Sequence, residues 1–394
     1  MNKNSDNKLV PKLRFPDFTT KESWNLMQIG DILDAQSSSL ALNKLELNKN
    51  GYAVYGADSI VGYIDTYQHS EQYISIVKDG SGVGRLNLCK SETSTLGTLA
   101  ALKSKDKDKY LIVWAYYLLK TIDFSSYVKG AGIPHIYYSD YKRHTIGVAK
   151  PKEQQKIADC LSSLDEVITA ESKKLEVLKE HKKGLLQNLF PQAGETVPKL
   201  RFKEFEKSGD WKYFNGNILF EPIANKNHNS DLPILAITQD RGAIPRDMID
   251  YTVIATDKSI ESYKVVEDGD FIISLRSFQG GIEFSNYKGI CSPAYIILRN
   301  KVDLVKIFFK YYFKTDIYIF QLNKNIEGIR DGKMVSYKQF SDIQLPLPTL
   351  PEQQKIASCL SSIDELIIAQ SQKLEALQLH KKGLLQSMFP TVNN

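Results

Sequence analysis

Residues 153–191 read EQQKIADCLSSLDEVITAESKKLEVLKEHKKGLLQNLFP, and residues 352–390 repeat that stretch as EQQKIASCLSSIDELIIAQSQKLEALQLHKKGLLQSMFP. The two copies are identical at 28 of 39 positions. A shorter repeat, PKLRF, precedes each of them, at residues 11–15 and 198–202. The copies lie 187 to 199 residues apart, which is too far for the unit of a solenoid protein. The chain is therefore a duplicated module that consists of a leader, a variable region and a long helix.

Each long copy carries apolar residues at alternating intervals of four and three, which is the a and d pattern of a coiled coil. In the first copy this seam consists of Ile157, Leu161, Leu164, Ile168, Leu175, Leu178, Leu185 and Leu189. In the second copy it consists of Ile356, Leu360, Ile363, Ile367, Leu374, Leu377, Leu384 and Met388. The seam is interrupted at equivalent places, namely Glu171 and Lys182 in the first copy and Gln370 and Lys381 in the second.

The seam predicts two helices of about 36 residues, each roughly 54 Å long. We expect these helices to pair with each other, although two helices docked separately on their own domains would show the same pattern. If Asn394 were joined to Met1, the new junction would resemble the internal junction around residues 189–202. Such a chain can fold with approximate two-fold symmetry, with one globular domain at either end.

Each variable region has the pattern of a mixed α/β domain. In the first region, Tyr73–Val77 predicts a strand and Leu111–Leu119 a buried helix. In the second region, Phe271–Leu275 and Ala294–Leu298 predict strands, and Leu304–Phe313 predicts a buried helix. The two regions share this outline but little sequence, as two different recognition tasks would require.

The net positive charge of the chain is confined to these regions and their leaders. The net charge is +5 and the isoelectric point is near 8.7. Residues 151–190 hold seven Lys and seven acidic residues, and residues 351–390 hold four of each. The excess of positive charge therefore lies in the variable regions and their leaders. This distribution is consistent with phosphate contact, but alone it is a weak indication.

Several catalytic motifs are absent from the sequence. Residues 328–333 (GIRDGK) lack the spacing and the Ser or Thr of a phosphate-binding loop, and residues 79–84 (DGSGVG) favour a hairpin turn over a dinucleotide loop. There is no HExxH sequence and no Asn-Pro-Pro-aromatic sequence of an amino-methyltransferase. His181 and His380 are repeat mates, which favours packing or partner contact over catalysis. We expect no catalytic residue, no metal site and no cofactor in this chain.

No apolar run approaches 18 residues and no signal-peptide pattern is present, so we expect a cytoplasmic protein without membrane contact.

The combination of repeats resembles the specificity subunit of Type I restriction–modification systems. The resemblance rests on the EQQKIA helix with its later Asp, the HKKGLLQ…FP ending, and the PKLRF leader. In each copy a tryptophan, Trp24 or Trp211, follows ten residues after the leader's Arg. The resemblance covers essentially the whole chain and includes the two dissimilar regions between the repeats.

The resemblance implies an α+β fold with two pseudo-symmetric mixed α/β target-recognition domains, separated by two long antiparallel coiled-coil helices. Each target-recognition domain would read one half of a bipartite, asymmetric site on double-stranded DNA. The helices would fix the gap and dock methyltransferase subunits, two in number. S-adenosylmethionine would bind to those subunits, and ATP and Mg would bind to motor-nuclease subunits where these are present.

On this basis we expect four segments. Residues 1–150 form the leader and first target-recognition domain, and residues 151–191 the first spacer helix. Residues 192–349 form the second leader and target-recognition domain, and residues 350–394 the second spacer helix and tail.

Base readout requires polar side chains on loops whose backbone can approach DNA closely. In the first domain the best candidates are Lys78–Arg85 and Lys129–Arg143, where glycines, basic residues and aromatic residues alternate. In the second domain they are Arg276–Gly281, Arg330–Lys338 and Gln239–Arg246. The candidate DNA-binding residues are Lys78, Ser81, Arg85, Lys129, His135, Tyr138, Lys142, Arg143, Arg241, Arg246, Arg276, Gln279, Arg330, Lys333, Tyr337 and Lys338.

Two alternatives stay open. Tyr138 and Tyr337 occupy equivalent positions, so a role in the domain core is at least as plausible for them as DNA contact. The chain as a whole could also be a structural adaptor that joins two partner subunits without reading DNA.

Overall fold

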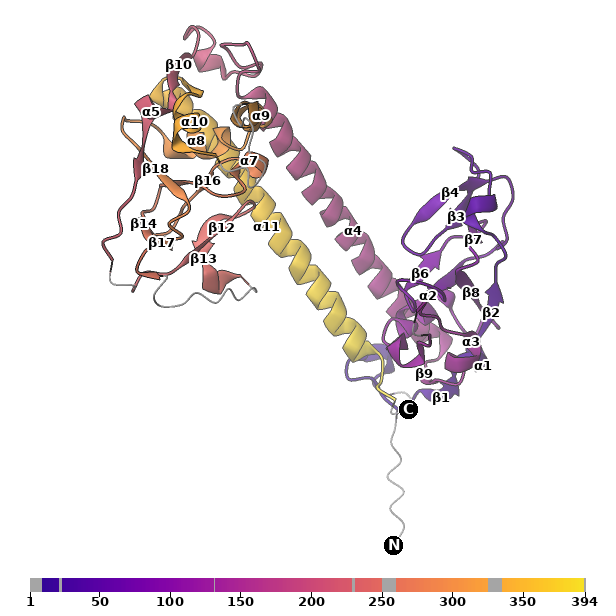
Figure 1. Cartoon of the computed structure of the whole chain (residues 1–394). Coiled ribbons are helices and arrows are strands. Elements are labelled where there is room, and N and C mark those ends of the chain that lie inside the picture. Colours follow the sequence, from indigo (N-terminus) through magenta and orange to yellow (C-terminus); the bar gives the residue numbers. More distant parts are fainter. Residues whose placement is uncertain are drawn as a thin grey trace. The chain divides into compact units, whose positions relative to one another are not determined.

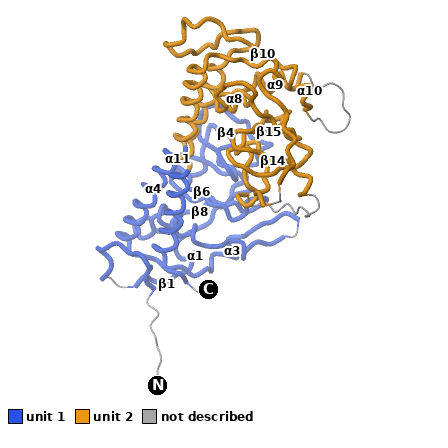
Figure 2. The backbone as a smooth tube through the Cα atoms, turned by 90° about the vertical axis from the view of Figure 1, so that its left-hand side faces the viewer, with its two compact units in different colours: residues 1–172, 372–394 blue, residues 173–371 orange. Residues whose placement is uncertain are grey.

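The computed structural model describes residues 9–20, 23–130, 132–228, 231–249, 260–324 and 335–392. The chain divides into two compact units. Unit 1 consists of residues 1–172 and 372–394, and unit 2 consists of residues 173–371 (Figure 2). Each unit therefore contains one variable region together with a segment of each long helix.

The two long helices are α4 (Pro151–Asn188, 38 residues) and α11 (Leu350–Met388, 39 residues). Each has a proline at its first or second position, where the missing N–H costs nothing. Both helices run without interruption between these residues, and both are labelled in Figure 1.

Unit 1 is built on a four-stranded antiparallel sheet in the order β2-β8-β5-β6. These strands are β2 (Leu33–Ser37), β8 (Leu99–Ser104), β5 (Tyr73–Val77) and β6 (Leu86–Cys89). The remaining strands are β1 (Asn25–Gln28), β3 (Tyr52–Tyr55), β4 (Ile60–Ile64), β7 (Ser94–Thr95) and β9 (Thr145–Val148). The helices of the domain are α1 (Ile29–Ile32), α2 (Ile112–Leu119) and α3 (Tyr138–Tyr141), with 3-10 turns η1 (Pro16–Phe18), η2 (Leu42–Lys44) and η3 (Phe124–Tyr127).

Unit 2 repeats this plan with the sheet order β11-β18-β15-β16. These strands are β11 (Phe220–Ile223), β18 (Ile296–Asn300), β15 (Phe271–Ile273) and β16 (Glu283–Phe284). The paired strands outside this sheet are β10 (Lys212–Asn215) with β19 (Gln344–Leu347), β12 (Leu235–Thr238) with β13 (Gly242–Pro245), and β14 (Lys264–Val266) with β17 (Gly289–Cys291). The shorter helices are α5 (Gly216–Leu219), α7 (Ser277–Gly280), α8 (Lys306–Tyr312), α9 (Asp316–Lys324) and α10 (Tyr337–Ser341), with 3-10 turns η4 (Lys203–Phe205) and η5 (Arg246–Met248).

The strand registers show that the two domains are structural copies. In unit 1, Leu33 at the start of β2 pairs with Ser104, and in unit 2, Phe220 at the start of β11 pairs with Asn300. The predicted strand Tyr73–Val77 coincides with β5, and the predicted helix Leu111–Leu119 is α2. The predictions in the second region are confirmed in type, with bounds that differ by at most two residues at either end.

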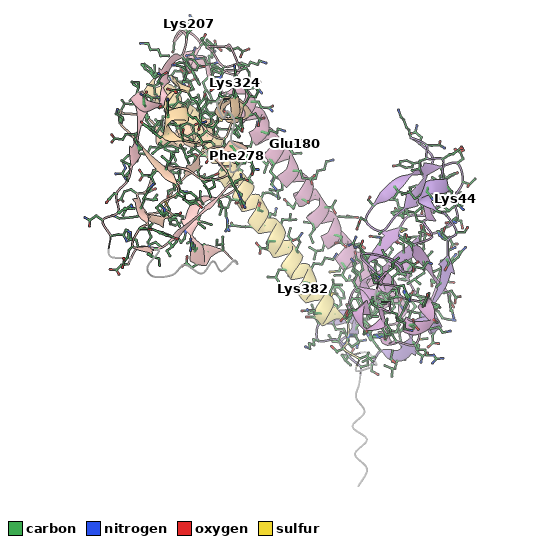
Figure 3. All side chains as sticks on the ribbon, viewed as in Figure 1. Lys44, Glu180, Lys207, Phe278, Lys324 and Lys382 are labelled. Carbon is green, nitrogen blue, oxygen red and sulfur yellow. The ribbon has the colours of Figure 1, made fainter. Side chains whose placement is uncertain are left out.

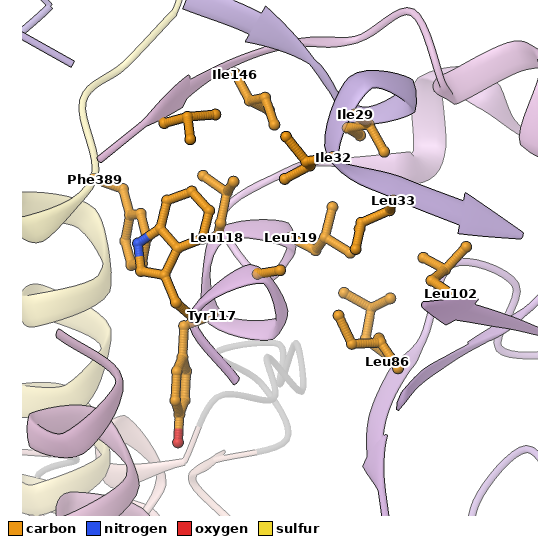
Figure 4. Close-up of a cluster of buried hydrophobic side chains, with 14 of the residues drawn as sticks. Ile29, Ile32, Leu33, Leu86, Leu102, Tyr117, Leu118, Leu119, Ile146 and Phe389 are labelled. Atoms are coloured by element: carbon orange, nitrogen blue, oxygen red, sulfur yellow. The ribbon is translucent and has the colours of Figure 1, made fainter. Parts of the chain in front are cut away.

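The core of unit 1 includes the end of the second long helix. Phe389, which follows α11, lies 6.0 Å from Trp24 and 6.3 Å from Trp114 between ring centroids. Figure 4 shows Phe389 in the same buried cluster as Leu118 and Ile146. In unit 2, Phe190 at the end of α4 packs against Trp211 and Phe308 at 6.4 Å and 5.2 Å.

Leader and helix end are also joined through the backbone. The amide of Leu13 donates to the carbonyl of Ser387 at 2.9 Å, and the amide of Leu200 donates to that of Asn188 at 2.9 Å. Each module's leader therefore packs on the end of the other module's helix, which confirms the cyclic symmetry expected from the order of the repeats.

The two long helices pair antiparallel within each unit. In unit 1 Asp165 pairs with Lys381, and Glu171, further along α4, pairs with Lys373, which comes earlier in α11. In unit 2 Lys182 pairs with Asp364 at 2.6 Å. The residue number on α11 falls as the number on α4 rises, so the helices run in opposite directions. Separate docking of each helix on its own domain is thereby excluded.

In the part of the chain that the structure describes, no helix is both long enough and apolar enough to cross a lipid bilayer.

Candidate DNA interface

Each recognition domain is fixed to its helix by a buried arginine–glutamate pair. Arg14 of the first leader donates from Nε and Nη2 to the two carboxylate oxygens of Glu153, at 2.7 Å and 2.8 Å. Arg201 donates in the same way to Glu352, at 2.7 Å and 2.9 Å. The hydrogen bonds to these carboxylates raise the pKa of both guanidinium groups. Two-pronged pairing of this kind adds geometric specificity to the attraction.

The next glutamine of each repeat supports the buried helix of its domain. Gln154 accepts from the amide of Leu111, which precedes α2, and Gln353 accepts from the amide of Val305, which precedes α8, both at 2.9 Å. The first amides of a helix have no intrahelical acceptor. The EQ pair of the repeated motif therefore joins a leader and a buried helix to the long helix.

A third attachment involves both long helices. The hydroxyl of Tyr117 donates to Asp165 on α4 at 2.7 Å, and the ammonium of Lys381 on α11 lies 5.5 Å from the Tyr117 ring centroid. In unit 2, Tyr311 donates to Asp364 at 2.8 Å and lies 5.7 Å from the ammonium of Lys182. Burial raises the pKa of both tyrosines, so they act as hydroxyl donors at neutral pH. Each domain thus contacts both helices of the pair.

The helix seam divides into two kinds of position. Near the start of each helix, the buried residues Ile157, Leu161, Ile356 and Leu360 belong to the core clusters of the domains. Leu175, Leu189 and Met388 are also buried. The other seam residues are half-buried: Leu164, Ile168, Leu178, Leu185, Ile363, Ile367, Leu374, Leu377 and Leu384. The polar interruptions at Glu171, Lys182 and Lys381 are explained by the interhelical ion pairs.

In the first domain the structure brings the two candidate loops together. The β5–β6 connection turns through Gly80, Gly82 and Gly84, all with φ near +90°, as a hairpin turn. Two backbone hydrogen bonds join this turn to the second loop. The Gly80 amide donates to the carbonyl of Pro134, and the Ile136 amide donates to the carbonyl of Lys78, both at 2.9 Å. The second loop is itself a hairpin, because Lys129 and His135 exchange both backbone hydrogen bonds at 2.8 Å and 2.9 Å.

The side chains of the two hairpins form one polar edge, and Lys142, which follows α3, lies beside Gly30 of α1. Ser81, Arg85, Lys129, Lys142 and Arg143 are exposed, while Lys78 and His135 are half-buried. Three of the cations have acidic neighbours: Lys78 contacts Asp79, Arg85 contacts Asp58, and Lys129 contacts Asp140. At the tip of the hairpin Ile133 is 72% exposed. A base edge or a phosphate would therefore meet a mixed polar and apolar surface.

Tyr138 and Tyr337 have equivalent backbone partners. The Tyr138 hydroxyl donates to the carbonyl of Leu33, and that of Tyr337 to the carbonyl of Phe220 at 3.1 Å. These carbonyls start the equivalent strands β2 and β11. The contacts favour a structural role for both tyrosines over DNA contact.

In the second domain the loop at Arg276–Gly281 lies in the position equivalent to the β5–β6 turn. Arg276 and Gln279 are exposed on it. The half-buried Lys314 holds this loop, since its ammonium donates to the carbonyl of Gly280 at 2.8 Å and to Glu283 at 2.6 Å. Burial lowers the pKa of Lys314 and raises that of Glu283.

The turn between β12 and β13 reaches the same loop. Gln239 donates from its amide nitrogen to the carbonyl of Arg276 at 3.4 Å. Arg241 is exposed and Arg246 is half-buried. Arg330 and Lys333 lie outside the described residues, and Lys338 is exposed on α10. The structure thus brings the 276–281 and 239–241 segments together in one surface.

Several residues of these sites were not predicted from the sequence. Lys314 follows a buried helix, and the only signal for it was that Lys-Thr also stands at the equivalent place in the first domain (Lys120-Thr121). Glu153, Gln154 and Asp165 are polar residues identical in the two copies. Identity at polar positions of the repeat was the available signal for them.

Among the described residues, no group of three or more His, Cys, Asp and Glu side chains has the arrangement of a metal site. What the geometry contains is a pair of domains with different polar loops, each anchored to both members of an antiparallel helix pair. This is the arrangement of a duplicated recognition scaffold.

Comparison with known proteins assigns the scaffold to a family. Residues 21–180 and 186–379 match the Type I restriction modification DNA specificity domain. The chain is 25% identical over 414 residues to the putative type I restriction enzyme MjaX specificity subunit of Methanocaldococcus jannaschii, covering 93% of each protein. It is 25% identical over 405 residues to the MjaVIII specificity subunit of the same organism, covering 93% of this chain and 92% of the relative.

Solved structures show the same fold. The crystal structure of the Type I restriction-modification S subunit from M. genitalium superposes with a TM-score of 0.66 at 18% identity, covering 98% of this chain and 100% of the other. The chain therefore belongs to the Type I restriction modification DNA specificity family. It is a DNA specificity subunit, the non-catalytic component of a Type I restriction–modification system.

Proposed function

We propose that each recognition domain reads one half of a bipartite DNA site, and that the paired helices fix the gap between the halves. The observation that carries the proposal is a contrast within the duplicated fold. The attachments of domain to helix recur residue for residue, as Arg14–Glu153 recurs in Arg201–Glu352. The loops at the polar edge, in contrast, differ completely between the domains.

The chemistry of the loops supports base reading. Arginine and lysine suit guanine, glutamine suits adenine, and an apolar side chain suits the methyl group of thymine. Exposed Arg143 and Ile133 in the first domain, and Arg276 and Gln279 in the second, offer these contacts. Since the two sets differ, the two half-sites should differ, and the complete site should be asymmetric.

A repeated exposed face supports the docking of two methyltransferase subunits on the helices. The c and g positions of each coiled-coil heptad lie on one flank of the seam. In unit 1 this flank consists of Cys160, Ser163, Val167, Ala170, Lys373, Ala376, His380 and Gly383. In unit 2 it consists of Cys359, Ser362, Leu366, Ala369, Lys174, Val177, His181 and Gly184.

Six of these eight pairs of residues are identical, although most of the side chains are exposed. Packing within the chain does not require identity at exposed positions. The same partner surface meeting each unit would require it. We therefore infer that one methyltransferase subunit docks on each unit, with S-adenosylmethionine bound to that partner.

Exchange of one domain tests the independence of the two readers. Residues 25–150 would be replaced by those of another specificity subunit, and methylated adenines would be mapped in cells that also express the methyltransferase. The proposal predicts that one half-site changes while the other half-site and the gap stay as they were. A change in both half-sites would contradict it.

A further inference from the structure

Each unit contains an open basic pocket where leader, long helix and recognition domain meet. The pocket of unit 1 has a volume of about 560 Å³ and is lined by Lys12, Lys120, Asp123 and Lys382. The pocket of unit 2 has a volume of about 430 Å³ and is lined by Lys179, Lys183, Lys199, Lys314 and Asp316, among others. No residue of either pocket belongs to the candidate reading loops, although Lys314 of the unit 2 pocket donates to the carbonyl of Gly280, and His144 of the unit 1 pocket directly follows Arg143.

The two pockets are repeat equivalents. Lys12 and Lys199 are the lysines of the two PKLRF leaders, and Lys382 and Lys183 are the second lysines of the two HKKG sequences. Lys120 and Lys314 each follow the buried helix of their domain, and a threonine follows each of them. Three elements far apart in the sequence therefore place lysines around the same hollow in both modules.

The lysines differ in whether their charge is already neutralised. The ammonium groups of Lys182 and Lys314, which also border the unit 2 pocket, pair with Asp364 and Glu283. Among the described residues, no acidic partner lies within ion-pair distance of Lys12 or Lys382 in unit 1, or of Lys183 or Lys199 in unit 2.

The local field at each pocket is therefore positive. One acidic residue lines each pocket, Asp123 in unit 1 and Asp316 in unit 2. Burial, and next the charge of Lys381, lower the pKa of Lys120. The lysines without an acidic partner outnumber the single aspartate by about two in each pocket, an excess of positive charge that attracts the negative charge of a phosphodiester.

We propose that each pocket binds one phosphate of the DNA backbone, outside the bases that the loops read. This inference rests on the proposed function and adds a sequence-independent contact to it. All the pocket cations are lysines, which act as point charges toward phosphate, whereas arginine is suited to the two-pronged recognition of bases. Because the pockets recur while the reading loops differ, their ligand is the same in both half-sites, as the backbone is.

The unit 2 pocket is also close to the reading loop of its domain. The first turn of α9 lines the pocket, and Asn323 near the other end of α9 donates to the carbonyl of Phe278 in the loop at 2.6 Å. A helix of nine residues is about 13 Å long. DNA phosphates follow one another at about 3.4 Å along the axis of each strand, so a backbone read by the loop has phosphates within reach of the pocket.

The test replaces the leader lysine and the second HKKG lysine of both pockets by glutamine (K12Q, K382Q, K183Q and K199Q) in the chain bound to its methyltransferase. The slope of log affinity for DNA against log salt concentration should become shallower by about 1.8, since each lost phosphate contact removes about 0.9. The methylated motif should be unchanged. The corresponding four arginine substitutions should restore the slope. The control is K44Q with K207Q, two exposed lysines outside the pockets that are labelled in Figure 3.

Three results would overturn the proposal. An unchanged salt slope in a folded quadruple variant, checked by thermal unfolding, would exclude a phosphate contact. Loss of the methyltransferase from the purified complex at an unchanged slope would identify an acidic protein surface as the ligand. Binding of inorganic phosphate to the wild-type chain by calorimetry, abolished in the variant while the DNA slope stays the same, would identify a small-molecule site. A motif that is not bipartite would instead refute the proposed function, whatever the slope.

Discussion

Two glutamates show how single residues hold this molecule together. Glu153 and Glu352 are both almost fully buried, and each neutralises the arginine of a leader. They differ in one contact, because the Trp211 indole also donates to Glu352 at 3.1 Å, whereas the indole nitrogen of Trp24 has no hydrogen-bond acceptor in its described surroundings. The stability of unit 2 therefore depends more strongly on Glu352 than the stability of unit 1 depends on Glu153.

We predict that Glu352→Ala lowers the free energy of unfolding of unit 2 by about 3–5 kcal/mol, because it leaves Arg201 buried without a counter-charge. Glu153→Ala should have the same kind of effect on unit 1, and a somewhat smaller one. Chemical unfolding of the full chain, followed by tryptophan fluorescence, measures both. The control is Glu206→Ala at an exposed position, and an equally small effect at Glu352 would refute this account of the leader.

A buried histidine predicts how stability depends on pH. His69 is 1% exposed, neither ring nitrogen has a described hydrogen-bond partner, and burial lowers its pKa from 6.5 to about 4. Between these two values the unfolded chain binds a proton that the folded chain does not. The contribution of His69 to stability is therefore fully present above pH 6.5 and is lost as the pH falls toward 4.

His69→Phe should weaken this pH dependence. Thermal unfolding of the variant should lose less stability than the wild-type chain between pH 6.5 and pH 4. The control is His181→Gln at an exposed position on α4, which should follow the wild-type curve. Parallel curves for His69→Phe and the wild type would show that the buried histidine does not govern this range.

At the residue scale, the sequence indicated which residues recur in the two modules, but it did not indicate which residues these contact in the folded chain. Glu153 and Asp165 belong to the repeated EQQKIA helix, yet no local pattern indicates that Glu153 meets Arg14, 139 residues away. Tyr138 and Tyr337 were predicted as candidates for DNA contact because they lie in basic, aromatic loops. Their hydroxyl contacts to strand carbonyls depend on tertiary packing, which the pattern does not contain.

The long helices are held together by polar as well as apolar contacts. Lys182 and Asp364 form an interhelical pair at 2.6 Å, and their repeat mates Lys381 and Asp165 form the same pair. A seam that is wholly apolar allows helices to slide or reverse, and paired charges fix the register.

We predict that Lys182→Glu destabilises unit 2 by about 1–3 kcal/mol, because it opposes Asp364 with a like charge. The charge-swapped double variant K182E/D364K should recover part of that loss. Lys381→Glu should act on unit 1 instead. Unfolding curves of the three variants measure the effect, and failure of the swap to recover any stability would show that the pair does not set the register.

A half-buried lysine, Lys314, holds the 276–281 loop of the second domain in place. Lys314→Met removes the donor to the Gly280 carbonyl and leaves Glu283 without its counter-charge. We predict lower stability and a relaxed sequence preference in the second half-site only, as measured by mapping methylated adenines. The double variant K314M/E283Q should regain stability but not preference. Recovery of both would mean that Lys314 acts only as a counter-ion.

At the element scale periodicity was the most reliable guide. The heptad pattern predicted both long helices and their pairing, because the spacing of apolar residues follows directly from helix geometry. Strand bounds were less well predicted: β18 begins at Ile296, two residues after the predicted start. Such ends are set by the neighbouring strand, which in this case is β11, about 75 residues earlier in the chain.

At the scale of the whole molecule, the chain is a duplicated module in which each leader packs against the helix end of the other module. Phe389 packs in the unit 1 core, and Phe190 occupies the same place in unit 2. The order of the repeats predicted this closure, since a cyclic order of leader, domain and helix places each leader beside the other module's helix end. The DNA target could not be predicted, because it depends on loop geometry as well as composition.

Lengthening both helices tests the spacer proposal. One heptad inserted after Ser172 and one after Ser371, which are repeat mates, would keep the seam in register and add about 10.5 Å to each helix. The gap in the methylated motif should grow by about three base pairs, given about 3.4 Å for each pair, with both half-sites unchanged. An insertion of four residues after Thr169 alone shifts the seam out of register and serves as the comparison. An unchanged gap after the matched insertion would contradict the spacer role.

The most direct test of the account is to express this chain with its methyltransferase and to map methylated adenines across a genome by single-molecule sequencing. We expect one asymmetric motif made of two different half-sites with a gap of constant length. A single uninterrupted motif, or no motif in spite of a stable complex with the methyltransferase, would contradict the claim that two different readers act from one helical spacer.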